Sequence, residues 1–285
     1  MEMGITDASK ELSLLGQHFR STRLDPPTGN GIAGLARSFG VDPTTPLFFN
    51  LISEVRGRID ALQKFAATVI DAELDDTLRG DVHQATTSFA NLFSPDFLLN
   101  RWEDTCNRML PDANLKTLLW FGQTARRHRP LRAISAQEVS EITSKLREAL
   151  ASLDEDAHLD WMKAPLEDGL QRLIVTIEHL RFFGHDYAIE QLLALNLRIS
   201  ALQQTRDASP RRDQAKAAGL WKCLSALSVV ATLLMLPDQG ATAISRYQAW
   251  ASQLIASTPR LPHEQRLLAP PAVVLPKEPE IVAAK

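Results

Sequence analysis

The residues best suited to chemistry in this sequence are scattered and do not combine into a catalytic motif. Gly29, Gly31 and Gly34 match the spacing G-x-G-x-x-G. That spacing binds a dinucleotide pyrophosphate when a buried strand leads into it and a helix follows. Pro26 and Pro27 precede these glycines, and consecutive prolines are incompatible with a central strand. We therefore interpret the stretch as a plain loop before a short helix, and we predict no cofactor.

The histidines show no zinc-helix spacing such as H-E-x-x-H. Their densest set is Glu178-His179 with His185-Asp186, and Gly184 separates the two pairs, so they need not share a face. We interpret them as surface histidines near a helix end, where the helix dipole stabilises a charged imidazole. The alternative is a metal or acid/base site.

A nucleophilic mechanism has little support in the sequence. There is no G-x-S-x-G elbow. Cys106 follows two acids that raise the pKa of a thiol, and Cys223 lies in an apolar run that is typical of a packing residue. Two cysteines also exclude a disulfide scaffold and a thiolate zinc cluster. We predict that the protein is not an enzyme; the alternative is a helical enzyme whose site is assembled from residues distant in sequence.

One cluster of cations stands out. Its members follow one another at the end of a predicted helix: Arg126, Arg127, His128, Arg129 and Arg132. Cations at this position offset the carbonyl dipoles of the helix end, so we interpret the cluster as a solvated helix terminus. The alternative is a basic patch for nucleic acid or an acidic partner. The formal net charge of −3, from 31 basic and 34 acidic residues, argues against nucleic acid.

The elements that position these residues are predicted to be helices almost throughout, so the fold class is all-α: a multi-helix bundle with a Pro-rich flexible C-terminal tail. The longest helix is expected over Pro46–Val69, because Pro46 suits a first turn and apolar residues recur there in steps of four and three. We predict that this apolar stripe is an interaction surface. Its members are Phe48, Ile52, Val55, Ile59 and Leu62.

Three further helices are expected before residue 130. They are Asp76–Leu92, a helix that starts after an N-cap at Ser94 and runs to about Leu110, and Ala113–Arg127. Pro130 ends the last of them.

Three more helices are expected in the following region. Ser135 and Glu138 form a capping box that starts the first. The second covers the amphipathic run 159–180, where Pro165 predicts either a kink or a true start near residue 164. Gly184 is a suitable C-terminal stop, and the third covers 186–203.

The apolar run from Leu220 to Leu236 offers two interpretations. It contains Val229 and one charge, Lys222. Its 17 residues make about 25 Å of helix, slightly less than the ~30 Å hydrocarbon core of a bilayer. Helices buried inside a large all-α domain are also apolar on all sides. We favour a buried core helix, and the alternative is a transmembrane helix.

The predicted organisation has five parts. They are an N-terminal helical region (1–134), a helical bundle region (135–203), a polar linker (204–212), an apolar C-terminal helical pair (213–257) and a disordered tail (258–285). The tail contains six prolines and cannot form a core.

We expect a non-enzymatic helical module for protein–protein interaction or regulation, of bacterial cytoplasmic type, whose apolar faces bind a protein partner or a second copy. Hydrophobic residues make up 45% of the chain and charged residues 23%, which is ordinary for a globular protein. The first residues lack a basic end and an apolar run, so we expect no secretion signal. The alternative is an inner-membrane-tethered effector or sensor whose transmembrane helix is 220–236.

Overall fold

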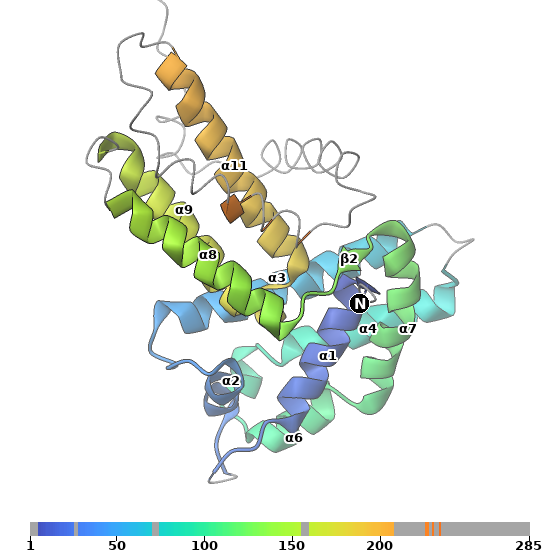
Figure 1. The fold of residues 1–285 in the computed structure, drawn as a ribbon. Coiled ribbons are helices and arrows are strands. Elements are labelled where there is room, and N and C mark those ends of the chain that lie inside the picture. Colours follow the sequence, from blue (N-terminus) through green and yellow to red (C-terminus); the bar gives the residue numbers. More distant parts are fainter. Residues whose placement is uncertain are drawn as a thin grey trace, which may run out of the picture. The chain divides into compact units, whose positions relative to one another are not determined.

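The computed structural model describes residues 5–25, 28–69, 74–154 and 160–207, together with positions 226, 227, 230 and 234. Within these residues the protein is all-α, as predicted, with eleven helices and one sheet of two short strands (Figure 1). The predicted tail, 258–285, lies outside the described residues.

The elements follow one another along the chain with short connections. Their bounds are β1 (Ile5–Thr6), α1 (Ala8–Ser21), α2 (Gly31–Phe39), α3 (Pro46–Thr68), α4 (Asp76–Asn91), α5 (Pro95–Leu98), α6 (Trp102–Met109), α7 (Asp112–His128), β2 (Leu131–Arg132), α8 (Ala136–Asp154), α9 (Asp160–Glu178), α10 (Leu180–Phe183) and α11 (His185–Asp207).

Helix α1 is central to the first group of helices, and the sequence analysis did not predict it. The side chain of Asp7 caps it by accepting a hydrogen bond from the Lys10 amide at 2.8 Å. Small residues on one face bring α1 close to α7. Ser9 and Ser13 donate hydrogen bonds to carbonyl oxygens of α7 at 2.6 and 2.7 Å, so their hydroxyls are satisfied although they are buried.

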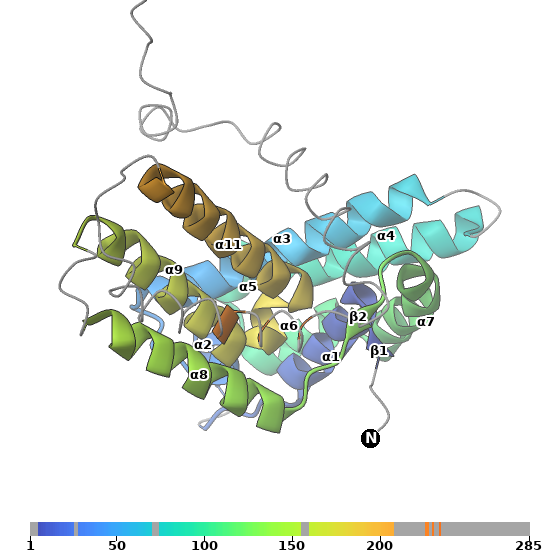
Figure 2. The same ribbon diagram turned by 45° about the horizontal axis from the view of Figure 1, so that its top comes forward.

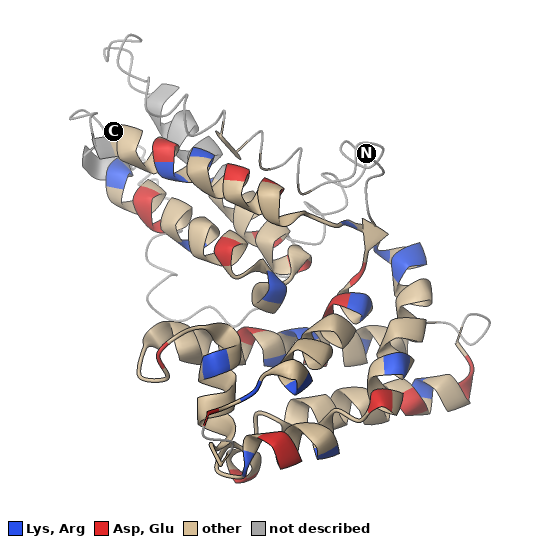
Figure 3. Cartoon of the chain, turned by 60° about the horizontal axis from the view of Figure 1, so that its bottom comes forward, with Lys and Arg blue, Asp and Glu red and all other residues tan. Residues whose placement is uncertain are grey.

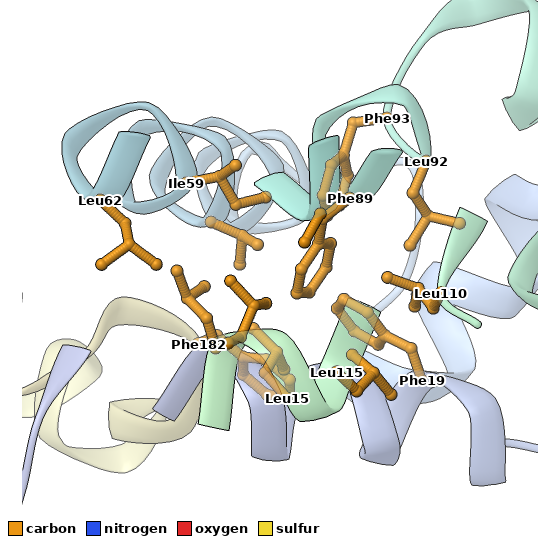
Figure 4. Packing of buried hydrophobic residues seen from close by; sticks show 14 of the residues in the cluster. Leu15, Phe19, Ile59, Leu62, Phe89, Leu92, Phe93, Leu110, Leu115 and Phe182 are labelled. Carbon is orange, nitrogen blue, oxygen red and sulfur yellow. The ribbon is translucent and has the colours of Figure 1, made fainter. Parts of the chain in front are cut away.

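The main hydrophobic core lies between α1, α3, α4, α6 and α7, and α10 closes it (Figure 4). Phe19 of α1 lies at its centre, fully buried. Its ring makes edge-on contacts, with centroids 5.9 to 6.2 Å apart, with Phe39, Phe89, Phe93 and Trp102. Such edge-to-face pairs add to the stabilisation that apolar burial provides.

The apolar stripe of α3 is part of this core. Phe48, Val55, Ile59 and Leu62 are buried, and Ile52 is partly buried against the same cluster. The prediction that this stripe is an interaction surface for a partner is therefore wrong. Helices α1, α4 and α10 pack on α3 and cover it, because a one-sided apolar helix is stabilised most by burying that side within its own chain.

A second group contains α8, α9 and α11, in which α9 packs against both of the others (Figure 2). Apolar residues of each helix are buried there, including Leu146, Leu170 and Leu192. The capping box that was predicted to start α8 is confirmed. The Ser135 amide donates to Glu138 Oε2 at 2.8 Å, and the Glu138 amide donates to Ser135 Oγ at 3.2 Å.

Part of the apolar run 220–236 is described. Ala226, Leu227, Val230 and Leu234 are helical and buried, and their spacing places them on one helix face. The four residues named in the sequence prediction, Leu220, Lys222, Val229 and Leu236, lie outside the described residues.

The glycine-rich stretch is a loop only at Gly29, since Gly31 and Gly34 already lie in the short helix α2 that was expected to follow it. Asn30 caps α2 by accepting a hydrogen bond from the Ala33 amide. The glycines permit close packing. A Cβ atom at Gly31 would lie 2.9 Å from backbone atoms of 97–98, and one at Gly34 would lie 2.0 Å from the Trp102 ring. Their spacing therefore serves helix contacts in this structure.

Three predicted helix boundaries need correction. The helix expected from Ser94 to Leu110 is divided into α5 and α6, because the amides of Gly31 and Trp102 bond to carbonyls across the break, at Asn100 and Gly29. Helix α9 begins at residue 160, before Pro165, so the proposed start near 164 is wrong. Helix α11 continues to Asp207, past the predicted end at 203, since the sequence contains no Pro or Gly between Gly184 and Pro210.

Candidate functional site

The structure divides the predicted basic cluster among different contacts. Arg126 pairs with buried Asp7 at 3.4 Å, and Arg132 pairs with Glu138 at 2.5 Å. His128 and Arg129 both lie against the ring of Phe65, at centroid distances of 5.7 Å. Arg127 is exposed. The cluster is therefore not one continuous patch. Arg126 joins the end of α7 to the start of α1, His128 and Arg129 lie against α3, and Arg132 joins β2 to α8.

The outward face of α7 is a more coherent surface. Lys116, Trp120, Gln123 and Arg127 recur in steps of four, three and four, which places them on one side of the helix, and all four are exposed. The Trp120 side chain is 64% exposed, and neighbouring Leu119 is 40% exposed. A large aromatic residue this accessible, next to a second apolar side chain, is typical of an interaction surface.

The opposite side of α7 is held firmly. It packs against α1 and α4, and Leu115, Leu118 and Phe121 are buried between these helices. The hydrogen bonds from Ser9 and Ser13 add directional contacts to α1. The α7 face, defined as Lys116, Leu119, Trp120, Gln123 and Arg127, is therefore presented on a rigid support.

Lys, Arg, Asp and Glu are distributed over the described helices (Figure 3). Between Ala113 and Gln137, however, the sequence contains five Lys or Arg residues and no Asp or Glu. Asp112, one turn before Lys116, pairs with Arg20. Within the described part of the chain, no acidic side chain pairs with Lys116 or Arg127. The stretch 113–137 is therefore basic although the whole chain carries a net charge of −3.

A buried ion network joins α1, α3 and the start of α11. Glu11 accepts a hydrogen bond from Arg58 at 2.7 Å, and His185 Nδ1 lies 2.6 Å from the other carboxylate oxygen. All three side chains are about nine-tenths buried. Arg58 also donates to the carbonyl oxygens of Arg181 and Phe182, at 3.0 and 2.8 Å, and thereby satisfies backbone at the end of α10.

The backbone at Gly184 makes room for this network. Its φ of +84° is a conformation that residues with a side chain rarely adopt, and a Cβ atom there would lie 2.5 Å from Arg58 Nε. The predicted role of Gly184 as a helix stop is confirmed, since it is the C-cap of α10.

The ionisation of Glu11 reflects this environment. Burial alone would raise the pKa of the carboxyl group, but the contacts with His185 and the charge of Arg58 outweigh burial and lower it. Glu11 is therefore ionised at neutral pH, and Arg58 stays charged beside it. Because the three residues are buried and form ion pairs with one another, we assign the network a structural role.

Three carboxyl groups beside the network have raised pKa values, in contrast to Glu11. Burial raises the pKa values of Glu54, Asp186 and Glu190. For Glu190, burial and the charges of Asp186 and Glu54 raise the pKa to about 7, and only the charge of Arg129 opposes them. The described residues contain no group of His, Cys, Asp and Glu that is arranged to hold a metal ion.

We predict a pH-dependent effect of Glu190→Gln. The raised pKa means that the folded state holds the proton of Glu190 more tightly than the unfolded chain does, so wild-type stability decreases as the pH rises from about 4.5 to about 7. Gln removes this cost. The variant should exceed wild type in free energy of unfolding by about 2 kcal/mol at pH 8 and by ~0 kcal/mol at pH 4.

Urea denaturation at pH 4, 6 and 8 measures this difference. Glu141→Gln, on the exposed side of α8, is the matched control and should give the same small difference at every pH. A Glu190→Gln difference that does not change with pH would contradict the prediction.

The other predicted candidates lie apart. Glu178 forms an ion pair with Arg147, whereas His185 contacts Glu11, so the two His-acid pairs do not form one site. Burial lowers the pKa of His179. Burial raises the pKa of the Cys106 thiol to about 12, which makes it a poor nucleophile at neutral pH.

No helix that the structure describes is both long and apolar enough to cross a membrane.

The α7 face was not found by the sequence analysis, although a signal was present. A helical projection of 112–128 places Trp120 with Lys116 and Arg127, opposite the apolar side. We find no match to this chain among protein-family models, curated protein sequences or solved structures.

Proposed function

We propose that the protein is a non-enzymatic helical interaction module and that it binds a protein partner through the α7 face. The observation that supports this most strongly is Trp120, which is 64% exposed on a helix whose other side is fixed in the core. Tryptophan and arginine are enriched among residues that dominate binding energy at interfaces, and this face carries one of each.

Rigidity of the face supports the proposal further. An anchor that is already held in place loses less conformational entropy on binding than one on a loop. Helix α7 is bound on both flanks, by α1 and by α4, and its end is joined to the start of α1 through the pair between Arg126 and Asp7.

The test compares wild type with Trp120→Ala and Leu99→Ala. Leu99 lies just after α5 and is 72% exposed, so its substitution removes a similar apolar side chain at a different place. Each tagged full-length chain is used to isolate proteins from its native cells, and a protein that depends on Trp120 is purified for direct titration. We expect Trp120→Ala to weaken binding by about 30-fold, from the ~2 kcal/mol that such anchors contribute.

Thermal unfolding must be the same for all three chains, which the exposure of both side chains leads us to expect. Two outcomes would refute the proposal: no bound protein depends on Trp120, or Leu99→Ala weakens the same complex equally. Sedimentation tests self-association, which is the remaining case. If wild type is a dimer and Trp120→Ala is a monomer, the face binds a second copy of the chain and no other partner.

A further inference from the structure

We infer that the α7 face binds an acidic amphipathic helix of its partner. This inference rests on the proposed function and adds the chemistry of the partner. It follows from three properties of the face: the order of its side chains along α7, the availability of its two cations and the lack of Asp and Glu in the stretch 113–137.

The order of the side chains is that of a helix-binding surface. Lys116 and Arg127 are eleven residues apart, or about 16 Å along the helix axis. Leu119 and Trp120 lie between them. A partner helix that lies alongside α7 would therefore place apolar residues at its centre and a carboxylate toward each end, about three turns apart.

The two cations are available for such carboxylates. Other cations near this end of α7 are already engaged, because Arg126 pairs with Asp7 and Arg132 with Glu138. Within the residues that the structure describes, Lys116 and Arg127 have no such acidic partner. Since 113–137 contains no Asp or Glu, a partner acid would meet no like charge from this stretch.

The number of charges favours a protein helix over other anionic partners. Nucleic-acid surfaces neutralise many phosphates with Lys and Arg, and juxtamembrane segments that recognise anionic lipid carry clusters of four to eight cations. The α7 face has two cations, one at each end of an apolar centre. An acidic amphipathic helix satisfies both the apolar and the charged parts of the face, with one pair at each end.

The test uses two synthetic helical peptides that differ only in charge. Both carry leucines at positions 4, 7, 8 and 11 of a 14-residue alanine-rich helix; one has Glu at positions 1, 2, 12 and 13, and the other has Lys there. Binding to the full-length chain is measured by fluorescence anisotropy of the labelled peptide. We expect the Glu peptide to bind at least tenfold more tightly than the Lys peptide, with a preference that decreases as salt is raised.

Charge reversal on the protein makes the test specific. The double variant Lys116→Glu/Arg127→Glu should bind the Glu peptide at least tenfold more weakly and should prefer the Lys peptide. The matched control is Arg56→Glu/Lys64→Glu, which changes the net charge equally at exposed positions of α3 and should leave the preference unchanged. Thermal unfolding of both variants checks that the fold is intact.

Several results would overturn the inference. They are equal binding of the two peptides, a preference that survives Lys116→Glu/Arg127→Glu, or a preference that Arg56→Glu/Lys64→Glu also removes. Binding of anionic vesicles or of a single-stranded oligonucleotide that depends on Lys116 and Arg127, without binding of the Glu peptide, would also overturn it. If the Glu peptide fails while a natural partner still depends on Trp120, the inference is wrong and the proposed function stands.

Discussion

Glu11→Gln is expected to lower the free energy of unfolding at pH 7 by about 3 kcal/mol. Gln has nearly the shape of Glu, so packing changes little and the measured loss reports charge. Without the carboxylate, Arg58 remains buried between α1, α3 and the end of α10 and loses the anion with which it is directly paired. Removing one partner of a buried ion pair is costly for this reason, whereas exposed pairs contribute less than about 1 kcal/mol.

The effect of Glu11→Gln should also depend on pH, with a sign opposite to that of Glu190→Gln. The pKa of Glu11 is lower in the folded state than in the unfolded chain. The stability that its charge contributes is therefore present above pH ~4.5 and is lost as the pH falls through the lower, folded-state pKa. Wild type and Glu11→Gln should differ most at neutral pH and converge in acid.

A double-mutant cycle distinguishes charge from packing in this network. The double variant Glu11→Gln/Arg58→Met removes the unneutralised guanidinium, so it should recover part of the stability lost in Glu11→Gln. Recovery is incomplete because Met cannot donate to the carbonyl oxygens of Arg181 and Phe182. A Glu11→Gln loss no larger than that of Glu141→Gln, which breaks an exposed pair with Lys145, would show that the network does not stabilise the fold.

Local signals in the sequence were sufficient for most helices. The capping box at Ser135 and Pro46 in a first turn act within one or two turns, and the helices that they begin start where predicted. The helix predicted over 76–92 also forms within one residue of its predicted ends. The split between α5 and α6 depends on hydrogen bonds from residues near Gly31, about seventy positions earlier. No local pattern encodes such a contact.

Long-range contacts also explain why the buried network was not predicted. Glu11 is 47 residues from Arg58 and 174 from His185, so neither helical nor strand spacing relates them. Helix α1 was not predicted although Leu12, Leu15 and Phe19 recur at helical spacing. The part of its face that meets α7 is made of Ser9, Ser13 and Gly16, which give no apolar signal in the sequence. The sequence predicted which faces would be covered but could not specify which helix covers them.

The centre of the main core leads to the prediction with the largest expected effect. Phe19→Ala should lower the free energy of unfolding by about 4 kcal/mol, because truncating a buried Phe removes its apolar burial and leaves a cavity. Phe19 is surrounded by the rings of Phe39, Phe89, Phe93 and Trp102. In the Phe19→Ala variant each of these rings loses an edge-on partner. These rings come from α2, from α4 and the residues directly after it, and from α6, so they cannot all move inward to fill the space.

Phe49→Ala provides the control for this prediction within the same chain. Phe49 differs from Phe19 in environment and not in chemistry, since its side chain is 60% exposed, and its truncation should cost less than about 1 kcal/mol. Urea denaturation at pH 7 measures both variants, and equal m-values would show that each unfolds from a native state of the same compactness. Equal losses for Phe19→Ala and Phe49→Ala would mean that α1 does not lie at the centre of the core. In that case the support beneath α7, on which the proposed binding face depends, would be lost as well.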